Sequence, residues 1–420
     1  MKYQMLNIPG GDKLLPEYKK ILNAIKKDPV TASVIREFPD IYLVGGFIRD
    51  LIAGIESKDR DYVVIGPVEL HKIKRLAERL KGSFFILKNL VRIVLREGSP
   101  FPGEIDITFT QDPIVLDLSR RDFTINSIAW SLKDGIIDPF GGIKDLRKRI
   151  VRLISKENII SDPVRILRAY RIAVEINGRL TGTTRKSLSG LRLFLRNSPK
   201  ERITSEFMKL LSLRNPVKAV RAGIADNIFT VILDIKKKDL NKNLKLFQKL
   251  SNFYLKNSDL FPSERLSQGF SRIAFLRLVC LSYKKRDWLI RLSKKNQKRL
   301  DSLHRAIRRI KPELLLTPSE TLKARDKLFD LFYEIKDYPE DIAFITGNKI
   351  LFKEAERFRN CLSRPLVRGI DIARNKDIQS KHIGVLLKKL LKLQYAGRIT
   401  NREEALIELN KLKSRLKVKD

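Results

Sequence analysis

Ile41-Tyr-Leu-Val-Gly-Gly-Phe-Ile-Arg-Asp50, with Lys58-Asp-Arg-Asp-Tyr-Val-Val-Ile65 shortly after it, decides the fold of this 420-residue chain. A short apolar run that ends at two glycines is typical of a buried strand entering a tight turn. Residues 47–53 after the turn predict a short helix, and the apolar run from Asp61 to Ile65 predicts a second strand. These stretches therefore predict the start of a domain that mixes strands and helices.

The residues around this start extend the same pattern. Residues 14–36 predict a helix broken at Pro29, and residues 70–80 predict an amphipathic helix. Three further strands are expected at 84–87, 91–95 and 104–108. From about Lys144 onward the strands are expected to end, because apolar residues recur there at helical spacing. The predicted fold class is an α+β N-terminal domain with a mixed sheet and helices, followed by an all-α remainder.

The two glycines of the turn suit an anion. Gly45 and Gly46 have no Cβ, so the backbone there can approach a bulky ligand closely. The turn opens a helix, and helix N-termini favour phosphate groups. Arg49 lies one turn into that helix, where its guanidinium could bind a phosphate with two hydrogen bonds. A glycine pair by itself is more often a structural turn, so the turn does not decide the function.

Carboxylates follow the turn at a spacing that suits a metal ion. Asp59 and Asp61 are two residues apart in a predicted strand and share one face of it. Two such carboxylates repel unless a cation lies between them, and Mg²⁺ takes oxygen ligands together with substrate phosphates. Asp106, on a neighbouring strand, is a third catalytic candidate that could help to hold a second metal ion. The alternatives are a solvated strand end and an ordinary edge-strand aspartate.

Arginines recur in the two motifs that come next. Arg120 and Arg121 precede an apolar stretch and could hold a triphosphate. Asp162 stands at the N-terminal end of a later predicted helix, and Ser161 is expected to be the N-cap of that helix. Three arginines lie three residues apart and so occupy one face of it: Arg165, Arg168 and Arg171. Arginines on a solvated helix face are common, but three in register with a carboxylate are less so.

The charge is strongly positive and unevenly distributed. Lys and Arg number 86 and Asp and Glu 48, which gives a net charge of +38, typical of proteins that meet a polyanion. Residues 1–140 carry 21 basic and 19 acidic side chains, residues 141–330 carry 45 and 17, and residues 331–420 carry 20 and 12. A uniformly basic composition would have raised the net charge of all three segments. The excess in the middle favours a nucleic-acid-binding surface there over charge that serves solubility.

Other patterns exclude several classes of protein. The two cysteines, Cys280 and Cys361, are too few for a disulfide scaffold or a cysteine-only zinc site. The three histidines lie far apart and show no metal-ligand spacing. No apolar run reaches the ~18 residues that a membrane span needs. Residues 1–11 lack the apolar core of a signal peptide. We therefore expect a cytoplasmic protein without membrane association.

The motifs in order resemble those of a known family. Beside the Gly-Gly turn stand Arg120-Arg-Asp-Phe-Thr-Ile-Asn126, Asp138-Pro-Phe-Gly-Gly142, Asp162-Pro-Val-Arg-Ile-Leu-Arg168 and Glu201-Arg-Ile-Thr-Ser-Glu206. This set is similar to class II tRNA nucleotidyltransferases and bacterial poly(A) polymerases of the polymerase-β-like superfamily. The resemblance implies four domains: a nucleotidyltransferase head at 1–145, a helical neck for base selection at 146–215, and a tRNA-binding body and tail at 216–330 and 331–420.

The resemblance also implies roles for the residues. Asp59 and Asp61 would hold Mg²⁺. The nucleotide-binding residues would be Gly45, Gly46, Arg49, Arg121, Asp162, Arg165, Arg168 and Arg171. Family members read the base with an Asp and an Arg, here Asp162 and Arg165. Cytosine and adenine both offer an amino donor to the carboxylate and an acceptor to the guanidinium, whereas uracil and guanine present a carbonyl. The implied partners are the acceptor and TΨC arm of tRNA, CTP and ATP.

Two departures from the family pattern bear on the reaction. Ser161 stands where the family usually has Glu, which could alter base choice. Only 11 residues, 109–119, connect the predicted strand at 104–108 to Arg120. Family members that add the final adenosine carry a longer flexible loop there, so the resemblance is strongest to enzymes that add only the two cytidines of the CCA end. A complete CCA-adding enzyme, a poly(A) polymerase, a non-catalytic RNA-binding relative and a helical scaffold remain as alternatives.

Overall fold

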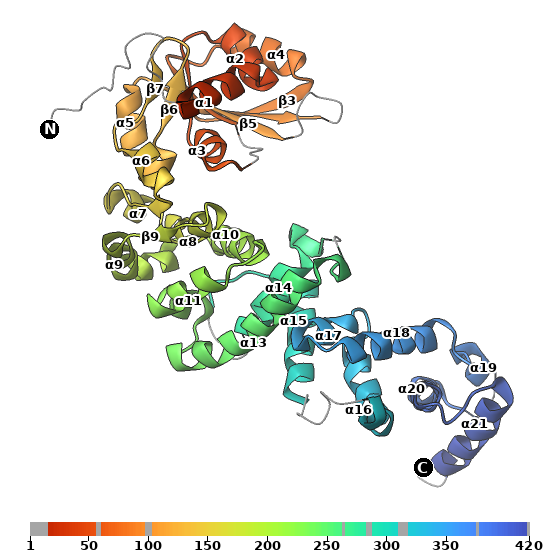
Figure 1. Cartoon of the computed structure of the whole chain (residues 1–420). Helices are drawn as coiled ribbons and strands as arrows, with labels where there is room; N and C mark the ends of the chain where they lie inside the picture. Colours follow the sequence, from red (N-terminus) through yellow and green to blue (C-terminus); the bar gives the residue numbers. More distant parts are fainter. Residues whose placement is uncertain are drawn as a thin grey trace. The chain divides into compact units, whose positions relative to one another are not determined.

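The computed structural model describes residues 16–55, 60–96, 103–262, 265–282, 288–309, 318–374 and 378–417. The chain divides into two compact units, residues 1–232 and 233–420 (Figure 1). The predicted domain boundaries at 145, 215 and 330 stay predictions. No helix within the described ranges combines the length and the apolar character that crossing a membrane requires.

The first unit contains a seven-stranded mixed sheet in the order β3-β4-β5-β2-β1-β6-β7. Its strands are β1 Ile41–Val44, β2 Arg60–Ile65, β3 Gly82–Leu87, β4 Leu90–Leu95, β5 Glu104–Thr110, β6 Ala129–Ser131 and β7 Gly135–Ile137. The central pair β2 and β5 is parallel, and the other pairs are antiparallel. The five strands predicted from the sequence are confirmed, and β6 and β7 extend the sheet beyond them.

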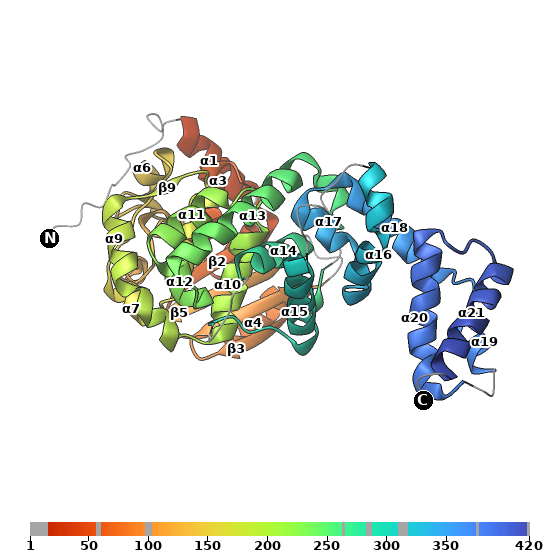
Figure 2. The same ribbon diagram turned by 90° about the horizontal axis from the view of Figure 1, so that it is seen from below.

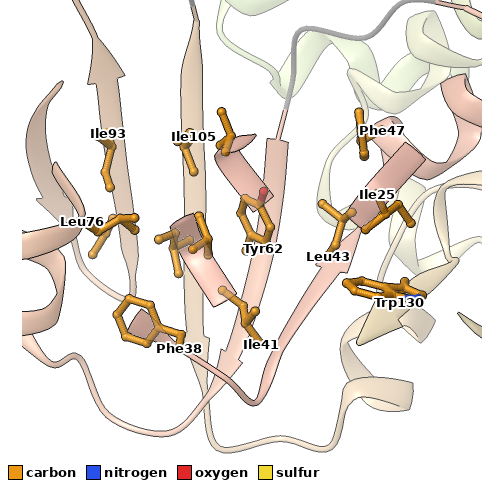
Figure 3. Packing of buried hydrophobic residues seen from close by; sticks show 14 of the residues in the cluster. Ile25, Phe38, Ile41, Leu43, Phe47, Tyr62, Leu76, Ile93, Ile105 and Trp130 are labelled. Atoms are coloured by element: carbon orange, nitrogen blue, oxygen red, sulfur yellow. The ribbon is translucent and has the colours of Figure 1, made fainter. Parts of the chain in front are cut away.

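Helices cover one face of this sheet from β7 to β4, while the end of the edge strand β3 is exposed. The helices of the sheet domain are α1 Pro16–Lys27, α2 Pro29–Glu37, α3 Gly46–Ala53, α4 Leu70–Arg79, α5 Ile114–Ser119 and α6 Gly142–Arg147. Alternate strand residues such as Leu43, Tyr62, Ile93 and Ile105 pack with helix residues such as Leu76 in one buried cluster (Figure 3). The predicted break at Pro29 is confirmed, because Asp28 caps α2 by accepting from the Thr31 amide.

The opposite face is covered over only part of its width. Ile114 and Leu118 of α5 pack on Val44, Val63 and Ala129, which lie on β1, β2 and β6. On β4 and β5 the residues of this face are only partly buried or exposed, whereas their neighbours on the other face are buried. The sheet therefore has one face in the core and a second face that is open from β5 to the β3 edge.

The rest of the first unit is helical apart from one small exception. Its helices are α7 Glu157–Ser161, α8 Arg165–Glu175, α9 Gly182–Leu191, α10 Lys200–Ser212, α11 Val217–Ala225 and α12 Ile228–Leu233. The expectation that strands end near Lys144 is wrong for β8 Ile150–Val151 and β9 Arg179–Leu180, which pair in parallel. Each has only two residues, too short for a periodicity to signal in the sequence.

The second unit contains helices and no strand among its described residues, as predicted, apart from one isolated bridge between Arg265 and Ser271. Its helices are α13 Lys237–Lys256, α14 Arg272–Leu281, α15 Lys294–Arg309, α16 Pro318–Glu334, α17 Glu340–Thr346, α18 Lys349–Ser363, α19 Gly369–Ala373, α20 Ser380–Ala396 and α21 Arg402–Lys417. Asp341 is fully buried between Arg272 and Arg299, at 2.8 and 2.5 Å. Helices α19, α20 and α21 share a separate apolar cluster at the C-terminal end (Figure 2).

Candidate active site

The site is built around the turn between β1 and α3. Gly45 precedes α3 with φ 76° and ψ −128°, a conformation that residues with a Cβ avoid. A Cβ on Gly45 would also lie 2.8 Å from Arg121 Nη1 and 3.7 Å from Asp61 Oδ2. The turn thus requires glycine for its backbone, and a Cβ there would displace the end of the Arg121 side chain. Three residues predicted to form the site, Gly45, Asp61 and Arg121, lie together here.

A row of charged side chains crosses the open face of the sheet beside this turn. Asp61 of β2 lies opposite Asp106 of the parallel β5, and Asp106 lies opposite Arg92 of β4. Arg92 donates to both Asp106 oxygens at 2.8 Å, and this hydrogen-bonded carboxylate raises the pKa of the Arg92 guanidinium. Asp106 therefore lies next to Asp61 as predicted, but Arg92 occupies both its oxygens, which a metal ion would also need.

The two predicted metal ligands lie at the start of β2 and just before it in the sequence. Asp59 lies outside the described residues, while Asp61 is the second residue of β2. Within the described ranges no three or more Asp, Glu, His or Cys side chains gather as a metal site. The donors that are present are carboxylate oxygens, which suit a hard cation such as Mg²⁺. Among the described residues, Asp61 supplies oxygens of this kind, and the pairing of Asp61 with Asp59 around Mg²⁺ stays a prediction.

Arg49 is held inside the protein rather than pointing freely to a ligand. It is 8% exposed, its Nε and Nη2 contact Asp50 Oδ1 at 2.7 and 2.6 Å, and its Nη1 donates to Asn126 Oδ1 at 2.8 Å. Asp50 and Asn126, the two partners of Arg49, both belong to the sheet domain. The predicted contact of Arg49 with a nucleotide stays a prediction; the structure shows that Arg49 links α3 to the 3₁₀ turn η1, Thr124–Asn126.

The polar contacts continue from Asn126 to α8. Asn126 Nδ2 donates to Asp122 Oδ1 at 2.7 Å, and Arg168 Nε lies 2.9 Å from Asp122 Oδ2. Burial alone would raise the pKa of the Asp122 carboxyl, but Arg168 and the Asn126 amide hold it below its ordinary value. A continuous chain therefore runs from Arg49 through Asn126 and Asp122 to Arg168.

Asp162 and Arg165 stand at the start of α8 as predicted. Arg165 Nη1 donates to the backbone oxygens of Arg120 and Asn158 at 2.8 and 3.1 Å, which ties the helix to the arginine-rich turn. Arg202 of α10 donates to Asp162 Oδ2 at 2.8 Å. The other oxygen, Asp162 Oδ1, is buried and has no hydrogen-bond partner among the described residues. An unpaired buried carboxylate oxygen is costly and calls for a donor.

Ser161 does not cap α8. It is the last residue of α7, and its hydroxyl donates to the Asn158 backbone oxygen at 3.0 Å. The prediction of an N-cap at Ser161 is therefore wrong, because a separate helical turn ends there and Asp162 and Pro163 lie between the two helices.

The three arginines of α8 share a face but differ in their surroundings. Arg171 contacts Glu206 of α10 at 2.8 Å and Glu175 at 2.6 Å. Burial opposes the charge of Arg171, but these carboxylates hold the pKa of its guanidinium above its ordinary value. The side chain of Arg168 is 40% exposed, against 23% for Arg165 and 15% for Arg171. Arg168 is thus the most accessible of the three, and Arg171 is the most firmly paired.

Sequence reasoning missed Asn126, Asp122, Arg92 and Arg202 as members of the site. Asp122 and Asn126 lie four residues apart in the same motif as Arg121, and that motif was the available signal. Arg92 and Arg202 come from a strand and a helix distant in sequence, and their spacing offers no pattern that would single them out.

Comparisons with known proteins identify two related domains and several relatives. Residues 41–152 match the poly(A) polymerase head domain, and residues 179–237 match a domain described as the probable RNA- and SrmB-binding site of polymerase A. A CC-adding tRNA nucleotidyltransferase of Synechocystis sp. is 27% identical over 88% of this chain and 92% of that protein. A protein of the same name from Geobacter sulfurreducens is 35% identical over 45% of each chain.

Other relatives carry other names, and the solved structures share the fold. Relatives matched over 39–42% of this chain are called multifunctional CCA protein, poly(A) polymerase I and A-adding tRNA nucleotidyltransferase. The Thermotoga maritima CCA-adding enzyme, solved in complex with tRNA, superposes over 93% of this chain and 97% of that one, with a TM-score of 0.70 and 23% identity. At this identity the likeness establishes the fold.

Proposed function

Because the chain belongs to the family of tRNA nucleotidyltransferases and poly(A) polymerases that share this head domain, we propose that it adds CMP to the 3′ end of tRNA. The products would be the two cytidines of the CCA end and pyrophosphate. The observation that carries the proposal is the meeting of Gly45, Asp61 and Arg121 at one turn. A carboxylate, a guanidinium and an open backbone suit the transfer of a nucleotidyl group from a triphosphate.

In the proposed reaction one group of residues binds the phosphates of CTP and another group binds its base. The backbone at Gly45 and Gly46 and the Arg121 guanidinium bind the phosphates. Asp61 and Asp59 would hold Mg²⁺, which would make the attacking hydroxyl more acidic and stabilise charge at the α-phosphate. The tRNA 3′-oxygen bonds to the α-phosphorus, its proton leaves to solvent, and the bond from that phosphorus to pyrophosphate breaks.

The base would be read at the start of α8. The buried Asp162 Oδ1 lacks a hydrogen-bond donor among the described residues, and the amino group of cytosine would supply one. A uracil carbonyl would instead face a carboxylate, which costs free energy. Arg165, which lies beside Asp162 at 3.8 Å, would donate to the ring acceptors of cytosine. Arg165 must then leave the backbone oxygens that it now contacts, which makes it a residue whose movement accompanies nucleotide binding.

Addition of cytidine without adenosine is supported by the segment between β5 and Arg120. The connection that is long and flexible in relatives able to add adenosine is occupied here by α5, which follows β5 after three residues. Ile114 and Leu118 anchor α5 in a buried cluster on the sheet. A helix anchored in a buried cluster cannot move far. It is therefore poorly suited to shift the base-reading residues from the position that fits cytosine to one that fits the larger adenine.

The basic middle of the chain would bind the acceptor and TΨC arm of the tRNA. Residues 141–330 carry 45 basic and 17 acidic side chains. Each phosphate that they neutralise releases counterions, so the affinity should fall steeply between ~50 and ~200 mM salt. A dissociation constant that does not change over this range would contradict binding through charge.

The reaction can be tested with end-labelled tRNA transcripts that stop before CCA or after CC. The first should gain two nucleotides with CTP alone and gain no more when ATP is added. The second should remain unextended with ATP. Efficient addition of AMP to the CC transcript would show a complete CCA-adding enzyme if CTP is also used, and an A-adding enzyme if it is not. Long ladders with ATP would show a poly(A) polymerase, and no extension by either nucleotide would show a non-catalytic relative.

A further inference from the structure

The open half of the catalytic face carries exposed apolar side chains beside the charged row. Cross-strand register puts the following residues on this face: Ser83, Phe85 and Leu87 of β3, Leu90, Arg92 and Val94 of β4, and Glu104, Asp106 and Thr108 of β5. We call them the open sheet surface. Phe85 is 55% exposed and Leu87 is 57% exposed. Phe85 and Leu87 are two residues apart and face the same way, and adjacent exposed apolar side chains of this kind mark interaction surfaces.

Phe85 stands in the same row as the catalytic aspartate. Phe85 lies opposite Arg92, Arg92 opposite Asp106, and Asp106 opposite Asp61. Neighbouring strands are about 4.8 Å apart, so three strand steps place Phe85 about 14 Å from Asp61 along the face. Nothing among the described residues of the sheet domain covers this row as α5 covers Val63. A partner on the open sheet surface would therefore extend directly to the reacting carboxylate.

The charge around this surface identifies the kind of partner. The hairpin of residues 81–96 contains four basic side chains, Lys81, Lys88, Arg92 and Arg96, and no acidic one. Glu104 and Asp106 of β5 both pair with Arg92, so the positive charge of the hairpin rests on Lys81, Lys88 and Arg96. This contrasts with the near balance of residues 1–140. Arg96 Nη2 donates to Ser83 Oγ at 2.8 Å, which places its guanidinium at the open sheet surface. An exposed aromatic ring among cations is the combination that binds single-stranded nucleic acid, by stacking on bases and attracting phosphates.

We propose that the open sheet surface binds the single-stranded 3′ end of the RNA substrate, with one base stacked on Phe85. The proposal rests on the proposed function, because a 3′-hydroxyl must reach Asp61 for the transfer to occur. The other occupant to weigh is a second copy of the chain paired along β3, which is an edge strand. Two such hairpins would bring Lys81 and Lys88 against the same cations of the partner, and lysines on an edge disfavour that pairing. RNA is favoured because its charge is complementary.

The test compares Phe85 with its neighbour Ile86. Ile86 is 43% exposed and apolar, but it lies on the opposite face of the same strand, so Ile86→Ala is a matched control. Phe85→Ala should raise the KM for a tRNA transcript lacking CCA about 5- to 30-fold, since stacking on one base has an effect of that order. The KM for CTP should stay unchanged. Phe85→Tyr, which keeps a ring for stacking, should restore the wild-type KM for tRNA.

A second readout does not depend on turnover. Phe85→Trp adds an indole to a chain whose own Trp130 and Trp288 are only 2% and 8% exposed. Fluorescence of the added indole should be quenched when a short single-stranded RNA is titrated in, and wild-type fluorescence should change little. If RNA quenches this fluorescence but neither the wild-type protein nor any variant incorporates CMP, the proposed function is wrong, whereas RNA binding to the open sheet surface is supported.

Three results would overturn the inference: equal KM effects of Phe85→Ala and Ile86→Ala, no quenching of Phe85→Trp by RNA, or a dimer that Phe85→Ala dissociates in light scattering. The last result would assign the surface to a second copy of the chain.

Discussion

Replacement of Asn126 by alanine tests whether the chain from Arg49 to Arg168 holds the sheet domain and α8 in register. The Asn126 side chain accepts one hydrogen bond from the Arg49 guanidinium and donates one to the Asp122 carboxylate, at 2.8 and 2.7 Å. Asn126 itself is 4% exposed. Alanine would leave the Arg49 guanidinium without one acceptor and the Asp122 carboxylate without one donor.

The size of the effect follows from the partners that remain. A hydrogen bond to a charged group contributes about 1.5–3 kcal/mol. In the variant Arg49 still contacts Asp50, and Asp122 still contacts Arg168 and the Phe123 amide. The free energy lost with each of the two hydrogen bonds should therefore lie at the lower end of this range. We therefore expect Asn126→Ala to lower the free energy of unfolding of the first unit by about 3 kcal/mol.

Urea denaturation followed by tryptophan fluorescence measures this change. Trp130 is buried in the sheet domain and reports on the first unit; Trp288 lies in the second unit and is removed by Trp288→Phe in every protein compared. Asn197→Ala is the control, because Asn197 is exposed and its loss should change the free energy by less than about 0.5 kcal/mol. An Asn126→Ala variant as stable as this control would refute the reasoning.

A second substitution separates the two hydrogen bonds of Asn126. Asn126→Asp keeps an acceptor for Arg49 but sets a carboxylate against Asp122. Because the two carboxylates repel only when both are ionised, the destabilisation should be larger at pH 8 than at pH 4. A deficit that does not vary with pH would show that Asp122 does not contact this position in solution.

Three further predictions concern the site. Asp61→Asn should lower CMP incorporation about 10²- to 10³-fold while tRNA affinity in filter binding changes little, and wild-type turnover would remove Asp61 from the catalytic site. Arg165→Ala should raise the KM for CTP far more than that for tRNA, and Asp162→Ala should relax discrimination against UTP; unchanged CTP:UTP selectivity in both would place base reading elsewhere. Asp122 has a folded pKa below its ordinary value of 3.8, so its stabilisation is present above about pH 4 and lost as the pH falls through the folded pKa. The stability deficit of Asp122→Asn should accordingly shrink between pH 7 and pH 3 in urea titrations, and a constant deficit would contradict the pairing with Arg168.

The sequence alone determined the local elements and the identity of the site motifs. The apolar run 41–44 ending at Gly45-Gly46 predicted the central strand and its turn, because strand burial and glycine turns are properties of a few adjacent residues. The even spacing of Arg165, Arg168 and Arg171 predicted their common helix face for the same reason. The helical nature of the second unit also followed from local periodicity.

Only the tertiary structure decided which of these residues meet. Asp61, Asp106 and Arg92 lie in one row because β2 is parallel to β5 and β5 antiparallel to β4, and strand order is set by packing between distant segments. The same holds for Arg49, whose hydrogen bond to Asn126 joins residues 77 positions apart in the sequence. The exposed side of Phe85 is a further case, since an apolar strand residue looks the same in sequence whether or not a helix covers it. Local patterns report on neighbours along the chain, whereas burial and pairing depend on segments that only the folded chain brings together.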